Sequence, residues 1–380
     1  MADLKAYREK IDNIDEKLVS LFKERMDTAL EIAKFKAQNN LPVLNASRER
    51  EIISKVTELC GDDLAMYGKI LYSVLFDVSR SYQNTYITKN TILAKDIEDA
   101  LENTSKEFPK KAVVACQGVE GAYSQQACDK LFAFPSIMYF NRFEGVFQAV
   151  ESGMCKYGIL PIENSSYGTV GEVYDLMKKH KFFITRSIKL KLSHTLLSKK
   201  GVKLSDVKEI FSHQQAIGQC SEFLKSLKNV KVTVCENTAQ AAKMVSESER
   251  NDVAAISSVN CAHLYGLSVL SDNVQDSDNN YTRFICISKN LEIYPGANKI
   301  SLMMTLPHQP GSLYTTISKF SALGLNLTKL ESRPILGSDF EFMFYLDMDA
   351  SIYSDEVIKL LCEFENSLDT FVFLGSYYEI

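Results

Sequence analysis

The apolar residues of the first segment repeat with the spacing of one long helix. From Leu4 to Phe35 the side chains of this stripe follow alternating steps of three and four residues, over about nine helical turns. The stripe consists of Leu4, Tyr7, Ile11, Ile14, Leu18, Leu21, Arg25, Thr28, Ile32 and Phe35. Two further helices are expected, one starting near Ser47 and one over residues 65–83. Helices of this length with short connections predict a helical bundle that needs a partner chain to cover its stripe.

The rest of the chain consists of a polar segment followed by two stretches with different sequence patterns. A polar segment, residues 89–110, is interpreted as a partly helical linker after the helical domain of residues 1–88. In residues 111–290 short apolar runs alternate with helical stretches, which predicts an α/β domain with largely parallel sheets. Residues 298–380 follow the order β-α-β-β-α-β, the ferredoxin-like arrangement. The fold class predicted is therefore multidomain: all-α, then α/β, then α+β.

Composition excludes several classes of function. The formal net charge is −5 with scattered basic residues, which argues against a nucleic-acid-binding face. The nine cysteines show no C-x-x-C spacing and the five histidines no H-x-x-x-H, so no metal site is expected. No dinucleotide or P-loop fingerprint is present, so no nucleotide cofactor is expected. The N-terminus is too charged for a signal peptide and no stretch reads as a membrane span, which favours a soluble cytoplasmic protein.

Arg25 stands where the stripe calls for an apolar side chain, so its charge must be paired or must serve a ligand. Lys36 projects from the same face of the helix about 16 Å away, and a small dianion between the two would satisfy both. Ser79 and Gln83 are neighbours on one face of the third helix. The pattern leaves open that Arg25 pairs with a buried glutamate and that Ser79 only packs. Arg8 lies about 25 Å from Arg25 along one helix, so it could serve only a partner chain's site.

Residues 4–88 resemble the AroQ-type chorismate mutase domain, through the stretches REKIDNIDEKLVSLFKER, EIAKFK, LPV and SRERE. The resemblance implies a helical dimer whose active site contains Arg8 donated across the dimer, Arg25, Lys36, Arg48, Glu49, Ser79 and Gln83. Arg8 and Arg25 would hold carboxylates, Lys36 and Gln83 would face the ether oxygen, and Glu49 would accept from the substrate hydroxyl. Such a rearrangement needs a folded substrate and donors where charge develops, without proton transfer. Asn45 stands where the family often has Asp.

Three stretches of the middle domain are unusually polar for segments that follow strands: residues 118–127, 161–173 and 212–220. The carboxyl ends of strands are where open α/β sheets bind ligands. Each stretch alone is better explained by a turn or a helix cap. Together with NNYTRF, residues 279–284 at the start of a further strand, they favour a site.

Residues 111–290 resemble prephenate dehydratase, and the threonine-arginine-phenylalanine motif is the mark of that family. The resemblance implies two α/β lobes with a cleft between them, similar to periplasmic binding proteins. Thr282 would be the central catalytic residue, donating to a departing hydroxyl, with Glu236 as an alternative proton source. Substrate-binding residues in or near the cleft would be Asn164, Ser165, Gln219, Glu236, Arg283 and Phe284. Because strand alternation puts Arg283 opposite Thr282, a bracing role is favoured for Arg283 over contact with substrate.

The stretches PGSLY and LESRP of the third domain resemble the phenylalanine-binding motifs of ACT domains. The resemblance implies that L-phenylalanine binds between two such domains as a feedback inhibitor. Its ligands would be Gly311, Ser312, Leu313, Glu331, Ser332, Arg333 and Pro334. Tyr314 stands where a smaller residue is often found. From the pattern alone, a plain helix start and a surface ion pair explain the same residues.

From Leu4 to Tyr378 the chain resembles fused proteins that carry mutase, dehydratase and regulatory domains in this order. The resemblance implies a bifunctional isomerase and lyase of L-phenylalanine biosynthesis, which converts chorismate through prephenate to phenylpyruvate. It also implies a homo-oligomer, at least a dimer. A mutase fused to a prephenate dehydrogenase would need the dinucleotide fingerprint that is missing. A non-catalytic amino-acid sensor with the same folds is the alternative from another class, although Thr282 and the mutase cations are all present.

Overall fold

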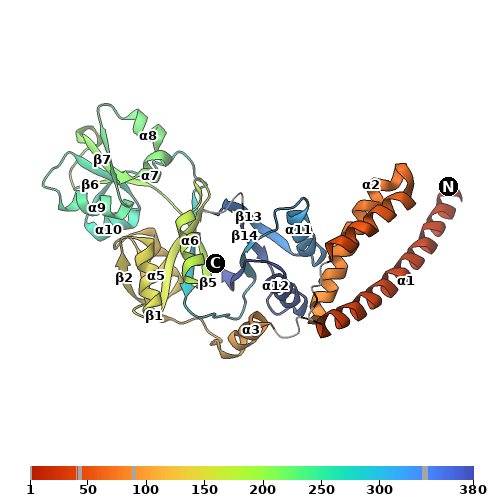
Figure 1. The fold of residues 1–380 in the computed structure, drawn as a ribbon. Coiled ribbons are helices and arrows are strands. Elements are labelled where there is room, and N and C mark those ends of the chain that lie inside the picture. Colours follow the sequence, from red (N-terminus) through yellow and green to blue (C-terminus); the bar gives the residue numbers. More distant parts are fainter. Residues whose placement is uncertain (1, 40, 42–44, 88–90, 336–340) are drawn as a thin grey trace. The chain divides into compact units, whose positions relative to one another are not determined.

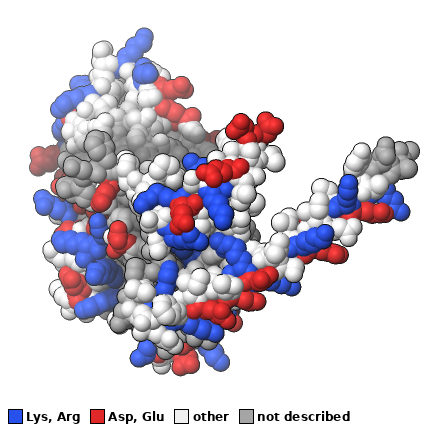
Figure 2. Space-filling view, turned by 45° about the vertical axis from the view of Figure 1, so that its right-hand side comes forward, with Lys and Arg blue, Asp and Glu red and all other residues white. Residues whose placement is uncertain are grey.

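The computed structural model describes residues 2–39, 41, 45–87, 91–335 and 341–380. Contacts divide the chain into two compact units. The first comprises residues 1–96, 303–345 and 353–371, and the second residues 97–302, 346–352 and 372–380. No helix in the described ranges is long and apolar enough to cross a membrane. On the face shown in Figure 2, basic and acidic side chains are interspersed, as the scattered charges of the sequence predicted.

The N-terminal part of the first unit consists of two long helices, α1 (Ala2–Gln38) and α2 (Ala46–Ile87) (Figure 1). Gly61 adopts φ 68° and ψ 170°, so α2 is interrupted there and the three predicted helices are present. The seam between α1 and α2 buries Met26, Ala29, Ala33, Val56 and Phe76.

The apolar stripe in the first half of α1 is not covered by α2. Leu4, Tyr7, Ile11, Ile14, Leu18 and Leu21 are each between 50% and 64% exposed. A single chain therefore leaves a long apolar helix face uncovered, as expected if a partner covers it.

The C-terminal elements are β12 (Lys299–Thr305), α11 (Ser312–Ala322), β13 (Asn326–Pro334), β14 (Phe342–Asp349), α12 (Asp355–Ser367) and β15 (Phe371–Glu379). Their strand order, β13-β14-β12-β15, is that of the predicted ferredoxin-like arrangement. Strands β12 and β14 belong in part to each unit. A short helix, α3 (Ile92–Asn103), lies in the segment expected to be a partly helical linker.

The first lobe of the second unit is a sheet with the strand order β15-β5-β11-β3-β1-β2. The bounds are β1 (Lys111–Gln117), β2 (Phe134–Phe140), β3 (Tyr157–Asn164), β5 (Phe183–Lys191) and β11 (Tyr281–Ser288), with the short β4 (Gly168–Thr169) paired to β3. Helices α4 (Tyr123–Leu131), α5 (Phe143–Glu151) and α6 (Gly171–His180) accompany it. Its core contains Val114, Cys116, Phe132, Tyr157 and Phe284.

The second lobe is a five-stranded sheet in the order β10-β6-β9-β7-β8. Its strands are β6 (Thr195–Ser198), β7 (Glu209–His213), β8 (Lys231–Cys235), β9 (Val253–Ser257) and β10 (Ser268–Ser271). They are joined by the 3-10 turn η1 (Leu204–Asp206) and by α7 (Gln214–Gln219), α8 (Ser221–Ser226), α9 (Thr238–Glu247) and α10 (Val259–Tyr265). The prediction of two α/β lobes in this part of the chain is confirmed.

The chain passes between the lobes twice, from β5 to β6 and from β10 to β11. The two crossings are bonded to each other: the Leu192 amide donates to the Asn280 carbonyl at 2.7 Å, and the Val274 amide to the His194 carbonyl at 2.9 Å. Strands β6 and β11 adjoin these crossings and run antiparallel to their neighbours. The expectation of largely parallel sheets was therefore wrong. Both sheets are mixed, because a strand that arrives from the other lobe enters from the opposite end.

Candidate active sites

Thr282 is the second residue of β11, and its hydroxyl is held from one side only. Its Oγ accepts a hydrogen bond from Asn164 Nδ2 at 2.8 Å, because Thr282 and Asn164 face each other in the β11–β3 register. Asn164 is oriented by the turn that follows β3: its Oδ1 accepts from the amides of Ser166 and Tyr167 at 2.9 and 3.0 Å. In the described part of the chain, the Thr282 proton has no acceptor. The hydroxyl is thus fixed as an acceptor and keeps its own proton available.

A chain of neutral polar groups continues from Asn164 through the two crossings. Asn280 Oδ1 accepts from Asn164 Nδ2 at 3.0 Å, and Asn280 Nδ2 donates to Gln219 Oε1 at 3.0 Å. Gln219 Oε1 also lies 2.7 Å from His194 Nε2. Burial lowers the pKa of His194, and only the bond to Gln219 opposes this effect. Burial therefore favours the neutral imidazole, and the contact with Gln219 Oε1 suits a proton on Nε2.

Ser165 holds the backbone of the motif. Its hydroxyl donates to the Asn279 carbonyl and accepts from the Tyr281 amide, both at 2.9 Å. Its amide donates to the Tyr281 carbonyl at 2.8 Å. The Ser165 side chain is therefore engaged in fixing β11 to the end of β3.

Two of the predicted residues lie apart from this chain of contacts. Glu236 is exposed just after β8 and, among the described residues, makes no contact with the Thr282 group. Phe284 is 3% exposed and packs in the core of the first lobe with Tyr157 and Phe132. The structure therefore brings together Thr282, Asn164 and Gln219, whereas Glu236 and Phe284 lie elsewhere.

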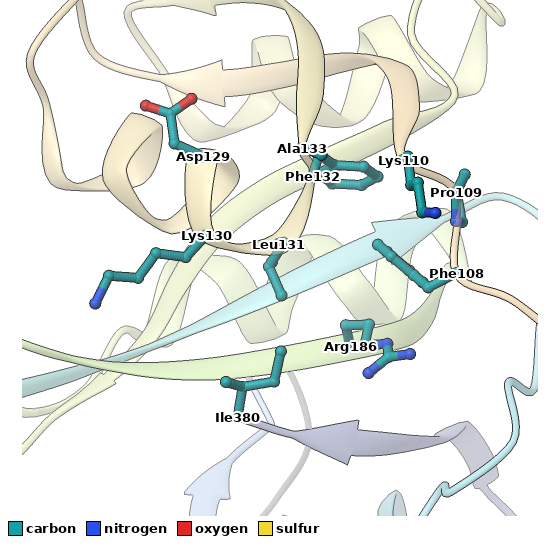
Figure 3. A pocket seen from close by; sticks show the side chains of 10 residues that line it. All are labelled: Phe108, Pro109, Lys110, Asp129, Lys130, Leu131, Phe132, Ala133, Arg186 and Ile380. Atoms are coloured by element: carbon teal, nitrogen blue, oxygen red, sulfur yellow. The ribbon is translucent and has the colours of Figure 1, made fainter.

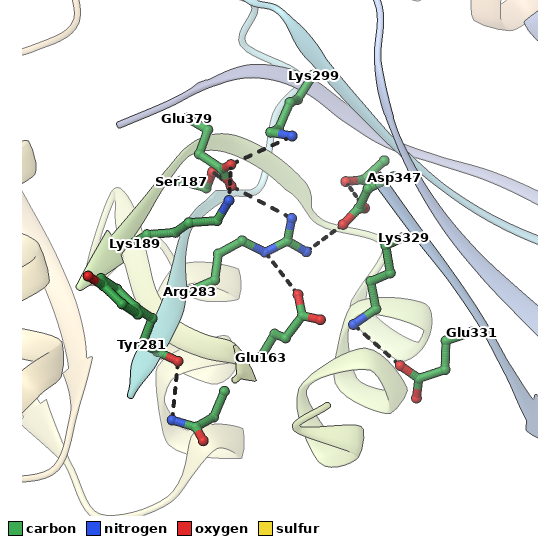
Figure 4. A network of polar contacts seen from close by, with 12 residues as sticks. Glu163, Ser187, Lys189, Tyr281, Arg283, Lys299, Lys329, Glu331, Asp347 and Glu379 are labelled. Carbon is green, nitrogen blue, oxygen red and sulfur yellow. Dashed lines mark hydrogen bonds and ion pairs between the residues drawn. The ribbon is translucent and has the colours of Figure 1, made fainter. Parts of the chain in front are cut away.

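The Arg283 guanidinium faces three carboxylates (Figure 4). Asp347 Oδ2 lies 2.5 Å from Nη2, Glu163 Oε2 lies 3.6 Å from Nε, and Glu379 Oε2 lies 3.8 Å from Nη1. Arg283 is 6% exposed, so these carboxylates neutralise a buried charge. This arrangement favours the bracing role over contact with substrate.

Arg25, on the seam of the helical domain, carries a charge that no carboxylate in the described part of the chain neutralises. Its Nη1 donates to Ser79 Oγ and to the Leu75 carbonyl at 3.5 Å, and its guanidinium lies 5.9 Å from the centre of the Phe76 ring. Among the described residues, Arg25 therefore does not pair with a buried glutamate. One turn beyond Ser79, Gln83 is 8% exposed and its Oε1 is buried without a hydrogen bond within the described ranges. Within the described ranges, the seam therefore holds a cation without a carboxylate and an amide oxygen without a hydrogen bond.

The other predicted mutase residues surround this seam at greater exposure. Lys36 is half-buried on α1. The Glu49 carboxylate forms an ion pair with Arg80, a residue that the sequence did not single out. Arg48 is exposed and pairs with Glu51 at 2.7 Å.

Arg8 is exposed on the first half of α1. Because α1 is one continuous helix, Arg8 lies far from Arg25 in the same chain. One chain therefore assembles Arg25, Ser79 and Gln83 and leaves Arg8 outside that group.

A pocket of about 350 Å³ lies at the start of α11. Of the residues predicted to bind phenylalanine, Ser312 and Leu313 line it, together with Leu306, Pro310 and Phe342. Gly311 is the N-cap of α11 at φ 91°, and Tyr314 is 65% exposed. Glu331, Ser332, Arg333 and Pro334 lie on β13 and are not among its lining residues.

A second pocket, of about 300 Å³, lies in the second unit beside α4 and β5 and contains none of the predicted residues (Figure 3). Its cation, Arg186, stacks on aromatic rings, with the guanidinium carbon 4.7 Å from the centre of the Phe108 ring and 5.6 Å from that of Tyr378.

Comparison with known proteins assigns both enzymatic domains. The family model of chorismate mutase type II matches residues 7–84, and that of prephenate dehydratase matches residues 114–292. The bifunctional chorismate mutase/prephenate dehydratase of Escherichia coli strain K12 is 32% identical over 383 residues, covering 98% of this chain and 96% of the relative. The chain belongs to the bifunctional chorismate mutase/prephenate dehydratase family. The predicted pair of activities is confirmed, and the dehydrogenase fusion is not supported.

Solved structures show the same fold in the dehydratase part. Prephenate dehydratase from Arthrobacter aurescens, in complex with L-Phe, is 28% identical with a TM-score of 0.64, covering 70% of this chain and 89% of that one. A protein described as a novel type of quorum quenching acylase, GqqA, is 29% identical with a TM-score of 0.63, covering 70% of this chain and 97% of its own. Because proteins with this fold have different described activities, the fold alone does not determine the roles of residues in this bifunctional mutase/dehydratase.

Proposed function

We propose that this chain rearranges chorismate to prephenate at the Arg25 seam and converts prephenate to phenylpyruvate at Thr282. L-phenylalanine bound at the start of α11 would be its feedback inhibitor. The observation that carries the proposal is the Thr282 hydroxyl, whose oxygen is held by Asn164 while its proton has no acceptor in the described part of the chain.

In the dehydratase step the bond from the ring to its carboxylate breaks and releases carbon dioxide. The electron pair enters the ring as the ring hydroxyl departs, so the ring becomes aromatic. The departing oxygen gathers negative charge, and a hydrogen bond from Thr282 stabilises that charge as it develops. The neutral chain of His194, Gln219, Asn280 and Asn164 fixes the threonine without placing a negative charge beside the leaving group. Glu236, exposed and outside this chain, is the weaker candidate for a proton source.

In the mutase step no proton moves, so the protein must hold two carboxylates and stabilise charge on the ether oxygen. Arg25 is suited to a substrate carboxylate because its charge has no carboxylate partner among the described residues. The Gln83 amide oxygen has no hydrogen bond among the described residues, and the side-chain amide can turn to present its N–H to the ether oxygen. Lys36, Glu49 and Arg48 remain the proposed further contacts.

The chain is proposed to act as a homodimer at least. The support is the exposed stripe from Leu4 to Leu21 and the distance of Arg8 from Arg25 along α1. A second α1 laid along that stripe would bury the apolar residues and would bring an Arg8 to the seam of the other copy.

The inhibitor site is proposed for the pocket beside Ser312 and Leu313. The first turn of α11 faces the pocket and could bind a carboxylate, although the Ser312 amide already donates to the Gln309 carbonyl at 3.3 Å. Leu306 and Phe342 provide an apolar wall for a ring. Glu331 to Pro334 remain candidates for the amine. The Arthrobacter relative was solved in complex with L-Phe, which supports L-phenylalanine as the ligand.

The test uses chorismate as substrate and detects phenylpyruvate without acid treatment. The Thr282→Ala variant should accumulate prephenate and form no phenylpyruvate, because its mutase domain is intact. Loss of both activities with the fold retained contradicts the assignment of the two sites, and a non-catalytic sensor gives neither product. Mass in solution with and without L-phenylalanine tests the dimer.

A further inference from the structure

We propose that Asp347 is a positioning residue of the dehydratase site. It lies on β14, outside residues 114–292 that match the prephenate dehydratase family. Nothing in the sequence connects it with Thr282, which it follows by 65 residues. The inference rests on the proposed role of Thr282 and adds a residue that acts on that site through Arg283.

Among the three carboxylates around Arg283, Asp347 is the one within hydrogen-bonding distance. Its Oδ2 lies 2.5 Å from Nη2, whereas the contacts with Glu163 and Glu379 are 3.6 and 3.8 Å long (Figure 4). Asp347 is 3% exposed, so the pair is shielded from water. A charged hydrogen bond in such a place fixes both the position and the plane of a guanidinium.

Asp347 is itself held from behind. Its Oδ1 accepts from Ser301 Oγ at 2.5 Å, and Ser301 Oγ lies 2.7 Å from the Tyr377 hydroxyl. The carboxylate therefore cannot turn freely, and it transmits the position of β14 to Arg283.

On the side of β3 the ladder is irregular beside Arg283, whereas on the side of β5 it is regular from Tyr281 to Cys286. The register shifts between Arg283 and Phe284. Such bulges occur next to active sites, where they change the direction of side chains. At a bulge the hydrogen bonds of the ladder are locally disrupted and hold the strand less firmly. Thr282 pairs with Asn164 while Arg283 pairs with Glu163, so a movement of Arg283 would displace the hydrogen bond between Thr282 and Asn164.

The C-terminal strand β15 is docked closely on the same sheet. Tyr378 pairs with Arg186 of β5, and a Cβ at Gly375 would lie 2.5 Å from the Ile184 carbonyl oxygen. Glu379 binds Lys189 of β5 at 2.8 Å. The C-terminal strands thus hold β5 as well as β11, which makes them part of the support of the dehydratase site.

The test is the Asp347→Asn variant of the full chain, with both activities measured on one sample. The dehydratase kcat should fall about 10- to 100-fold with KM changed less than about threefold, because a displaced group costs turnover more than binding. The mutase activity should not change. Glu209→Gln is the matched control: Glu209 is also a buried carboxylate, 8% exposed and bonded to Arg250 at 2.6 Å, but it lies in the second lobe. This control should keep its dehydratase kcat.

Coupling through Arg283 is tested by the double variant Arg283→Met/Asp347→Leu. Its dehydratase kcat should equal that of Arg283→Met alone, because Asp347 acts through Arg283. If Asp347→Asn does not fold, the double variant still decides, since apolar replacement of a buried ion pair is often tolerated. A wild-type kcat in either variant overturns the inference, and so does an equal loss in Glu209→Gln. Dehydration that survives in Thr282→Ala instead overturns the proposed site.

Discussion

Replacing Thr282 with valine removes one hydroxyl and keeps the shape of the side chain. In the folded protein the change deletes one acceptor, that of the 2.8 Å bond from Asn164. Asn164 Nδ2 keeps a second acceptor, Asn280 Oδ1 at 3.0 Å, so no donor is left unsatisfied. The stability lost should be about 1 kcal/mol, the net worth of one such hydrogen bond. The catalytic cost should be larger, about 3–4 kcal/mol or 10²- to 10³-fold in kcat, because a donor to the developing charge is lost.

The assay is phenylpyruvate formation from prephenate at neutral pH, with the mutase activity of the same sample as a measure of folded protein. Thr282→Ser is the matched control, since it keeps the hydroxyl and should stay within about tenfold of the wild-type kcat. A valine variant within about threefold of wild type would show that the hydroxyl donates nothing to the leaving oxygen. The reaction would then need another donor, and Glu236 would be the residue to change next.

Three further predictions concern the frame around the sites. Hydrogen bonds from Thr233 and from two basic side chains lower the pKa of Glu209 from 4.5 to about 2. The stabilisation that the Glu209 carboxylate provides is therefore full above pH 4.5 and is lost as the pH falls towards 2. In Glu209→Gln the urea unfolding midpoint should depend less on pH over that range. A Cβ at Gly218 would lie 2.2 Å from the Tyr167 hydroxyl, but the Tyr167 side chain is 46% exposed and can move aside, so Gly218→Ala should cost less than about 1 kcal/mol in urea unfolding, and nothing in a Tyr167→Phe background. Leu18→Lys, on the exposed stripe, should reduce the mass in solution and the mutase activity together.

The fold could be read from the sequence where side chains repeat with a local period. The stripe from Leu4 to Phe35 and the β-α-β-β-α-β order of the last domain both became elements of the expected kind. The direction of β11 could not be read in this way. A strand's direction depends on which end of the sheet the chain enters, and that is decided by the crossing before Tyr281, about ninety residues after the chain first left the sheet at Lys191.

The polar residues beside Thr282 likewise divide into those that the sequence pattern predicted and those that it did not. Asn164 and Gln219 stood out because each lies in a polar stretch after a strand. His194 and Asn280 were not predicted as site residues, because single polar residues in the crossings between the lobes give no periodic signal, although Asn280 lies within NNYTRF. Asp347 was missed for a different reason: in LDMD it is a polar residue on a strand, which the pattern assigns to solvent, yet it is 3% exposed.

The two proposed sites use burial in opposite ways. At the Arg25 seam, the proposed mutase site, a partly buried cation is left without a carboxylate within the described residues, so a substrate anion would complete the pairing there. At Thr282 the buried cation next along the strand is already neutralised, by Asp347, and the groups left beside the hydroxyl are neutral amides and a neutral imidazole. The first arrangement favours a dianion through charge, whereas the second holds one donor still. A substrate carboxylate at the dehydratase site must therefore find its cation elsewhere than Arg283, because displacing Asp347 would leave a buried charge unpaired.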